Sequence, residues 1–108
     1  MIDPFLIADD DTLRAKILLD TARINWLDLQ RYFARGATIK VDPSLNLIDV
    51  GFELYRDNKA TFEGWMAEGL VGAIEPEQAQ QWFDTQKELW AVVIAPWVLV
   101  QDKTKLDS

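Results

Sequence analysis

Asp49 and Glu53 are the pair of side chains best spaced for chemistry in this sequence. They lie four positions apart in "LNLIDVGFELYRD", so a helix brings both carboxylates to one face. Such a pair can bind a hard cation or act as general acid and base. However, Asn46 and Arg56 continue the same stripe, which is typical of a solvated helix face. The solvated face is the favoured interpretation, and a small carboxylate-dependent enzyme or ligand-binding protein is the alternative.

The sequence contains no histidine and no cysteine. Thiolate chemistry, disulfides, Ser-His-Asp triads and His- or Cys-based metal sites are therefore excluded. The run Asp9 to Asp11 lacks the interleaved ligands and the glycine of a calcium-binding loop, so it is better explained as a helix cap. No glycine-rich phosphate-binding motif occurs. The sequence thus favours a non-enzymatic protein, and we expect no catalytic residue, no metal site and no cofactor.

The net charge of the chain is −7, which restricts the partners that it can bind. An acidic surface repels nucleic-acid phosphates and anionic membranes, whereas it attracts a basic protein. The N-terminus has no basic region and no apolar stretch of signal-peptide length, so we expect a cytoplasmic protein. The charge also permits an acidic nucleic-acid mimic that binds a basic protein, provided that the acidic side chains gather on one face.

Five tryptophans are many for a chain of 108 residues. Trp26, Trp65 and Trp82 fall on the inner stripes of predicted helices, which places them in the core. Trp90 and Trp97 lie in an apolar run near the end of the chain, and tryptophan is enriched at interfaces as well as in cores. Trp90, Pro96 and Trp97 are therefore the candidate interaction surface.

That apolar run, "LWAVVIAPWVLV", spans Leu89 to Val100. Its twelve residues are too few to cross a membrane, since a transmembrane helix needs about 20. The β-branched residues before Pro96 favour an extended strand that is apolar on both faces, as in a sheet covered on both sides. Pro96 predicts a bend, after which residues 97–100 form a separate short strand.

The remaining patterns predict short helices interleaved with short strands. We expect helices over residues 11–24, 26–35, 45–57, 59–69 and 76–87, and strands over 37–41, 70–74 and the apolar run. The predicted fold is α+β, with about five short helices on a small sheet of three to four strands and the C-terminal apolar strand at its centre. We expect a single domain over 1–108, with flexible tails at 1–8 and 102–108.

Three segments together carry a resemblance to a known family. They are "LLDTARINWLDLQRYFARG", "VDPSLNLIDVGFELYRDN" and "ELWAVVIAPWVLVQ". Across residues 13–101 the sequence resembles the bacterial family called domain of unknown function 2288. The resemblance implies a short bacterial protein of a single domain, and it assigns no activity and no site residues.

Together these observations favour a soluble module that binds another protein or itself, for example as a homodimer. Large aromatic residues and a segment that is apolar on both faces suit such a role, and no ligand motif competes with it. We expect no nucleic acid and no membrane among the partners.

Overall fold

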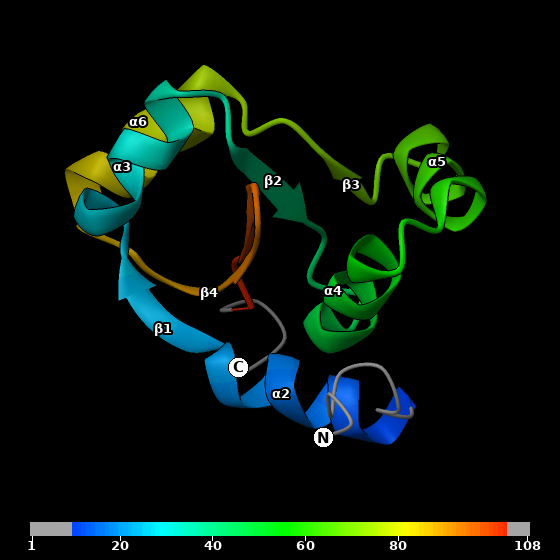
Figure 1. Ribbon diagram of the computed structural model, residues 1–108. Helices are drawn as coiled ribbons and strands as arrows, with labels where there is room; N and C mark the ends of the chain where they lie inside the picture. The colour runs from blue at the N-terminus through cyan, green and yellow to red at the C-terminus, as the bar shows by residue number, and fades with distance from the viewer. Residues whose placement is uncertain (1–9, 104–108) are drawn as a thin grey trace.

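Helices and strands alternate along the chain, and they build one five-stranded sheet (Figure 1). The computed structural model describes residues 10–103. Within this range the elements are α2 (Asp10–Asp20), β1 (Ala22–Asn25), α3 (Trp26–Ala34), β2 (Thr38–Val41), α4 (Leu47–Tyr55), α5 (Lys59–Ala67), β3 (Val71–Gly72), α6 (Pro76–Thr85), β4 (Glu88–Ile94) and β5 (Trp97–Gln101). The predicted α+β class is confirmed.

The sheet has one strand more than the sequence predicts. Its order is β1-β4-β5-β2-β3, and β2 and β5 form its parallel pair. The helix predicted over 11–24 ends at Asp20, and Ala22 to Asn25 pair antiparallel with Glu88 to Ala91. Ile24 explains the error, because it continues the apolar stripe of the preceding helix and also alternates correctly for a strand. Pairing with the distant strand β4 makes this segment a strand and not a continuation of the helix.

The apolar run forms the middle of the sheet, as predicted. It folds into the antiparallel strands β4 and β5, and Ala95 and Pro96 make the turn between them through a cis peptide bond. Pro96 therefore marks the predicted bend, and a separate strand begins at Trp97. In the strand order β5 is central and β4 adjoins it.

Both faces of the sheet are covered by helices, so the alternation within β4 and β5 produces two cores. Val92, Ile94 and Leu99 point to one face, where they pack with residues of α2 and α4; we call this the α4 face. Leu89, Ala91, Val98 and Val100 point to the opposite face, where they pack with residues of α3 and α6; we call this the α3 face. Figure 1 shows α3 and α6 on one side of the molecule and α4 and α5 on the other.

The predicted helical tryptophans divide between these cores. Trp26 and Trp82 are buried on the α3 face, where their rings meet edge to face with centroids 5.3 Å apart. Trp65 is half-buried against the α4 face. Their core location is the one that the helical stripes predict.

The predicted tails fall largely outside the described residues. This applies to 1–8 and 104–108, whereas Asp102 and Lys103 are described and half-buried. The Lys87 ammonium lies 3.8 Å from the Asp102 carboxylate. Between residues 10 and 103, no helix has the length and apolar character needed to cross a membrane.

Candidate functional site

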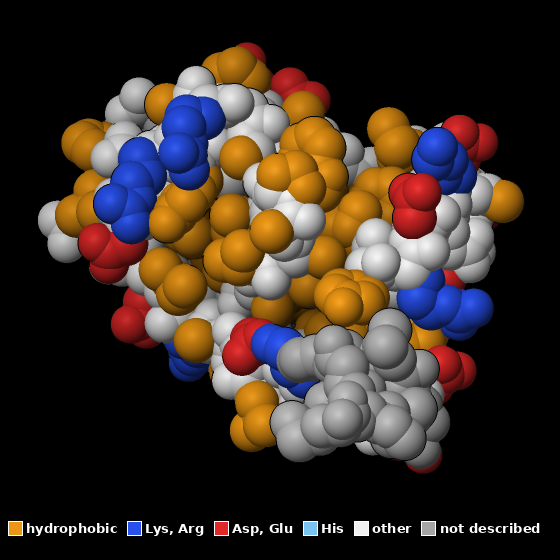
Figure 2. Space-filling model, viewed as in Figure 1, with side chains coloured by type: hydrophobic (Ala, Val, Ile, Leu, Met, Phe, Trp, Pro, Cys, Tyr) orange, Lys and Arg blue, Asp and Glu red, His pale blue; other side chains and the backbone are white. Residues whose placement is uncertain are grey.

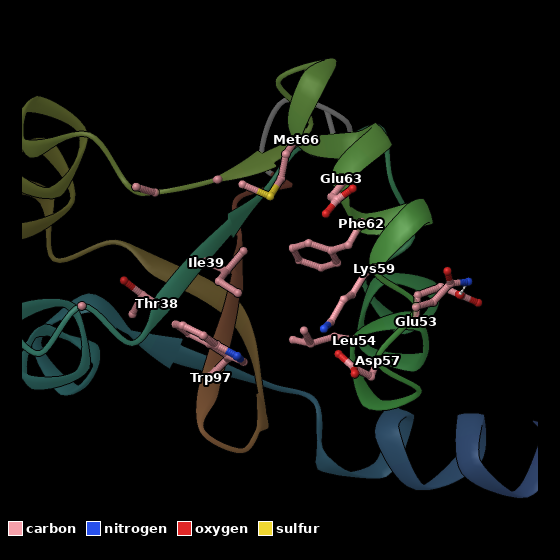
Figure 3. Close-up of a pocket in the computed structure, with 14 residues that line it drawn as sticks. Thr38, Ile39, Glu53, Leu54, Asp57, Lys59, Phe62, Glu63, Met66 and Trp97 are labelled. Atoms are coloured by element: carbon pink, nitrogen blue, oxygen red, sulfur yellow. Dashed lines mark hydrogen bonds between the residues drawn. The ribbon is translucent and has the colours of Figure 1, made fainter.

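A pocket of about 420 Å³ opens on the α4 face beside Trp97, between α5 and the strands β2, β3 and β5 (Figure 3). We call it the Trp97 pocket. Its apolar walls are Ile39, Leu54, Phe62, Met66 and Trp97. Figure 2 shows apolar side chains gathered across the middle of this side of the molecule, with charged side chains mostly around them. The pocket therefore offers an apolar surface that no described residue fills.

One helix and one strand position the aromatic walls of the pocket. Trp97 begins β5 immediately after the Pro96 turn, and its side chain is exposed despite its apolar character. Phe62 and Met66 lie one turn apart on α5, whose side chains reach across to the sheet (Figure 3). Phe62 is held in turn by Trp65, whose ring lies edge-on with centroids 6.1 Å apart.

The turn between α4 and α5 fixes the wall that faces Trp97. Asp57 adopts the left-handed backbone conformation, with φ 57°, which reverses the chain after Tyr55. The Asn58 side-chain oxygen then caps α5 by accepting a hydrogen bond from the Thr61 N–H at 3.3 Å. The Asn58 amide also donates to the Glu53 carboxylate. The turn is thus held by its own polar side chains.

Charged side chains surround the apolar walls. The lining includes the acidic residues Glu53, Asp57 and Glu63 and the basic residue Lys59, and the Glu53 carboxylate is turned to Asn58. Figure 3 shows Lys59 and Phe62 extending from α5 toward Trp97, with Asp57 at the rim of the same opening. The lining therefore carries an excess of negative charge around an apolar interior.

This chain matches one protein family over most of its length. Residues 12–102 match the family described as "Protein of unknown function (DUF2288)". The chain belongs to this family. The resemblance predicted from the sequence is confirmed.

One solved structure adds to that assignment. The chain is similar to PA1075 from Pseudomonas aeruginosa, whose solution structure was determined by NMR, with 39% sequence identity and a TM-score of 0.75. The likeness covers 86% of this chain and 86% of that one. No curated protein matches the chain.

The structure separates the three residues of the candidate interaction surface. Pro96 and Trp97 lie together at the exposed β4–β5 turn, whereas Trp90 pairs with Gln101 at the far end of the hairpin. Trp90 is half-buried, and the Arg23 guanidinium lies over its ring, 5.7 Å from the centroid. Only Trp97 of these three lines the pocket.

The structure also gives separate partners to the two candidate catalytic carboxylates. Asp49 forms an ion pair with Arg14 of α2, which ties α4 to α2. Glu53 accepts the hydrogen bond from Asn58 and lies on the side of the α4–α5 turn remote from Trp97 (Figure 3). Glu53 lines the pocket and Asp49 does not, so the pair does not converge on one site.

The acidic run at 9–11 begins α2, where Asp10 and Asp11 occupy the first turn and Asp9 lies outside the described residues. Negative charge is favourable at the positive end of a helix dipole. Over the part of the chain that the structure describes, no group of three or more Asp or Glu side chains is arranged to hold a metal ion.

Most of the pocket residues were not foreseen from the sequence. The helical stripe of the segment 59–69 places Met66 inward, yet Met66 is 54% exposed at the pocket wall. Lys59, Phe62 and Met66 do follow the spacing i, i+3, i+7 on one side of α5. This periodicity identifies a shared helix face. It does not show that a pocket separates that face from the sheet and leaves Met66 exposed.

Proposed function

We propose that this chain is a protein-interaction module whose Trp97 pocket binds a short, basic and apolar segment of a partner protein. The observation that carries the proposal is Trp97 itself. Trp97 is 38% exposed at the wall of an open apolar pocket, although Val98, which follows it, and Ile94, its partner on β4, are buried. Exposed tryptophans in concave apolar surroundings are frequent hot spots of protein interfaces.

The size and the walls of the pocket suit side chains of a partner. Its volume of about 420 Å³ lies within the usual range of ligand-binding clefts. Phe62 and Trp97 supply rigid aromatic walls, and Met66 supplies an adaptable one. One or two apolar side chains inserted here would cover surface that now faces water.

The charges favour a basic partner. Asp57 and Glu63 bring two carboxylates to the lining against the one ammonium of Lys59, and the whole chain carries −7. A segment with Lys or Arg beside its apolar residues would place positive charge at Asp57 and Glu63. An acidic segment would meet repulsion at the same positions.

The two alternatives have less support. A carboxylate-dependent enzyme needs groups that converge on a substrate, whereas Asp49 binds Arg14 and Glu53 binds Asn58. A nucleic-acid mimic needs acidic side chains gathered on one face, whereas those visible in Figure 2 are separated by basic and apolar side chains.

The test uses two matched peptides, Ac-Lys-Leu-Phe-Lys-NH2 and Ac-Glu-Leu-Phe-Glu-NH2, titrated into the 15N-labelled protein. Binding is followed at the indole N–H resonance of Trp97, which is assigned from its absence in Trp97→Phe. We expect saturable shifts with the basic peptide and at least about tenfold weaker binding of the acidic one. Shifts that never saturate up to about 5 mM, or equal affinities, would overturn the proposal.

Two variants of exposed apolar residues show whether the peptide occupies this pocket. Met66→Lys places a cation in the pocket wall and is expected to weaken the basic peptide at least about tenfold. Phe83→Lys is the control, because Phe83 is comparably exposed on α6 and does not line the Trp97 pocket. Equal losses in the two variants would assign the binding to general surface charge instead.

A further inference from the structure

We propose that β1 is the dimerisation strand of this protein, and that it pairs antiparallel with β1 of a second copy. β1 forms one end of the sheet, with β4 on its inner side. An open strand edge presents N–H and C=O groups that can extend a sheet into another chain. This proposal is independent of the Trp97 pocket, which lies over other strands.

The register of the β1–β4 pair identifies which backbone groups face outward. The Trp26 N–H donates to the Lys87 carbonyl at 2.8 Å, in line with the pairing of Ile24 with Leu89. Backbone groups of alternate residues along an antiparallel strand point to opposite sides. Ile24 therefore bonds inward to β4, while the N–H groups of Arg23 and Asn25 and the Arg23 carbonyl point to the open edge.

Exposed leucines lie on the two helices that precede and follow β1 in the chain. Leu18 and Leu19 lie in the last turn of α2, and Leu19 is 84% exposed. Leu27 is exposed in the first turn of α3. α2 packs on the α4 face and α3 on the opposite face, so these leucines come from helices on both sides of the sheet. A second copy would cover apolar surface above and below the new strand pair.

The local charges do not oppose a second copy at this edge, in spite of the net charge of −7. Like-charged chains repel, so self-association needs a surface that is locally neutral. Near β1 the charges are balanced, since Lys16 pairs with Asp20 at 2.8 Å and the Arg23 guanidinium lies 3.8 Å from the Glu88 carboxylate. The edge therefore lacks the negative excess that would repel a second copy.

The single charge of the strand also selects a register. Two-fold pairing centred on Arg23 would place the two guanidinium groups directly opposite each other, which is destabilising. Pairing centred on Ile24 places Arg23 opposite Asn25 of the second copy. The Asn25 N–H of each chain then donates to the Arg23 carbonyl of the other, and the contact is the same in both directions.

Sedimentation equilibrium of the full chain at about 10 µM to 1 mM measures the association, a range that covers weak dimers. We expect a mass that rises from 12.4 kDa toward twice that value. The amide protons of Arg23 and Asn25 should exchange more slowly as the protein concentration rises. A mass of 12.4 kDa throughout would overturn the proposal.

Two pairs of variants locate the interface. Arg23→Pro breaks no bond to β4, but its ring puts carbon atoms in the place of the N–H that points to the second copy, so it is expected to give a monomer, whereas Arg23→Ala adds no such obstacle and should still dimerise. Leu19→Lys tests the edge without touching the backbone and should weaken the dimer at least about tenfold. Its control, Met66→Lys, alters the Trp97 pocket and should leave the dimer intact.

The variants also distinguish a second copy at the β1 edge from a dimer that uses another surface and from a segment of the same chain that covers the edge. A dimer that survives both Arg23→Pro and Leu19→Lys would use another surface, and the proposal would be wrong. A monomeric wild type whose Arg23 and Asn25 amides are protected at every concentration would show that a segment of the same chain covers the edge. Failure of this proposal leaves peptide binding at Trp97 unaffected, so the two proposals can fail separately.

Discussion

Replacing Gln101 with leucine is expected to lower the free energy of unfolding by about 2 kcal/mol. Gln101 is the last residue of β5 and is only 1% exposed. Its side-chain amide donates to the Asp42 carbonyl at 2.9 Å and to the Leu45 carbonyl at 2.8 Å. Gln101 thereby holds the loop between β2 and α4 against the end of β5. α4 is the helix that supplies Leu54 to the Trp97 pocket.

The magnitude follows from what each partner loses. The Asp42 carbonyl still accepts a hydrogen bond from the Leu45 N–H at 3.1 Å. It therefore loses only one ordinary hydrogen bond, which lowers the free energy of unfolding by about 0.5–1.5 kcal/mol. The Leu45 carbonyl loses a donor in a part-buried setting, which costs about 1–3 kcal/mol. Leucine also removes the buried Oε1 of Gln101, which has no partner among the described residues, and this offsets about 1 kcal/mol.

Thermal and urea unfolding followed by circular dichroism measure the effect. A loss of 2 kcal/mol corresponds to a fall in melting temperature of about 8–16 °C for a domain of this size. The control is Gln80→Leu, since Gln80 is exposed on α6 and donates to Asp84 at the surface, at 2.9 Å. We expect the control to change stability by less than about 0.5 kcal/mol. Equal stabilities of Gln101→Leu and the wild type would refute the reasoning, because the Leu45 carbonyl would then have another donor.

Two further predictions concern stability. Gly64→Ala should stabilise α5 by about 0.5–1 kcal/mol, because a Cβ there meets no atom within 4 Å. Gly51→Val should lower the free energy of unfolding by about 1–3 kcal/mol, because its Cβ would lie 3.1 Å from Ile17. Urea unfolding of both variants checks that the two changes have opposite signs. The Ser44 hydroxyl and N–H donate to Asp42 and lower the pKa of that carboxyl below its usual 3.8, so this stabilisation is complete above pH 3.8 and is lost as the pH falls through the folded-state pKa. Ser44→Ala should therefore be less stable than the wild type at pH 7, with a difference that shrinks below pH 3.8; a constant difference would contradict the assignment.

The fold was predictable where a pattern is local. The continuous apolar run identified β4 and β5 as strands that are apolar on both faces, because each strand has a core on either side. Pro96 identified the turn for a local reason, since proline has no N–H to donate to a strand. β1 was missed because its partner, β4, lies more than sixty residues away in the sequence. A strand of four residues has too little periodicity of its own to compete with the helix before it.

The site was predictable only in part, for a related reason. Trp97 was a candidate because it lies in the apolar run and tryptophan is enriched at interfaces. The pocket around it combines residues as distant as Gly36 and Trp97, and no spacing along the chain relates them. Asp49 and Glu53 do share a helix, as predicted, but their partners Arg14 and Asn58 come from other parts of the chain. Partners that come from distant parts of the chain decide whether a carboxylate holds the fold together or is available for catalysis or ligand binding.

The order of the strands makes the two proposed surfaces compatible in one molecule. β1 ends the sheet on one side, while the Trp97 pocket lies over β2, β3 and β5. Adjacent strands are about 4.8 Å apart, so β1 and β3 lie about 19 Å from each other. A second copy paired with β1 would therefore extend the sheet away from the pocket. The dimer would carry two open pockets, and a partner with two basic apolar segments could occupy both, which increases the overall affinity without any new contact.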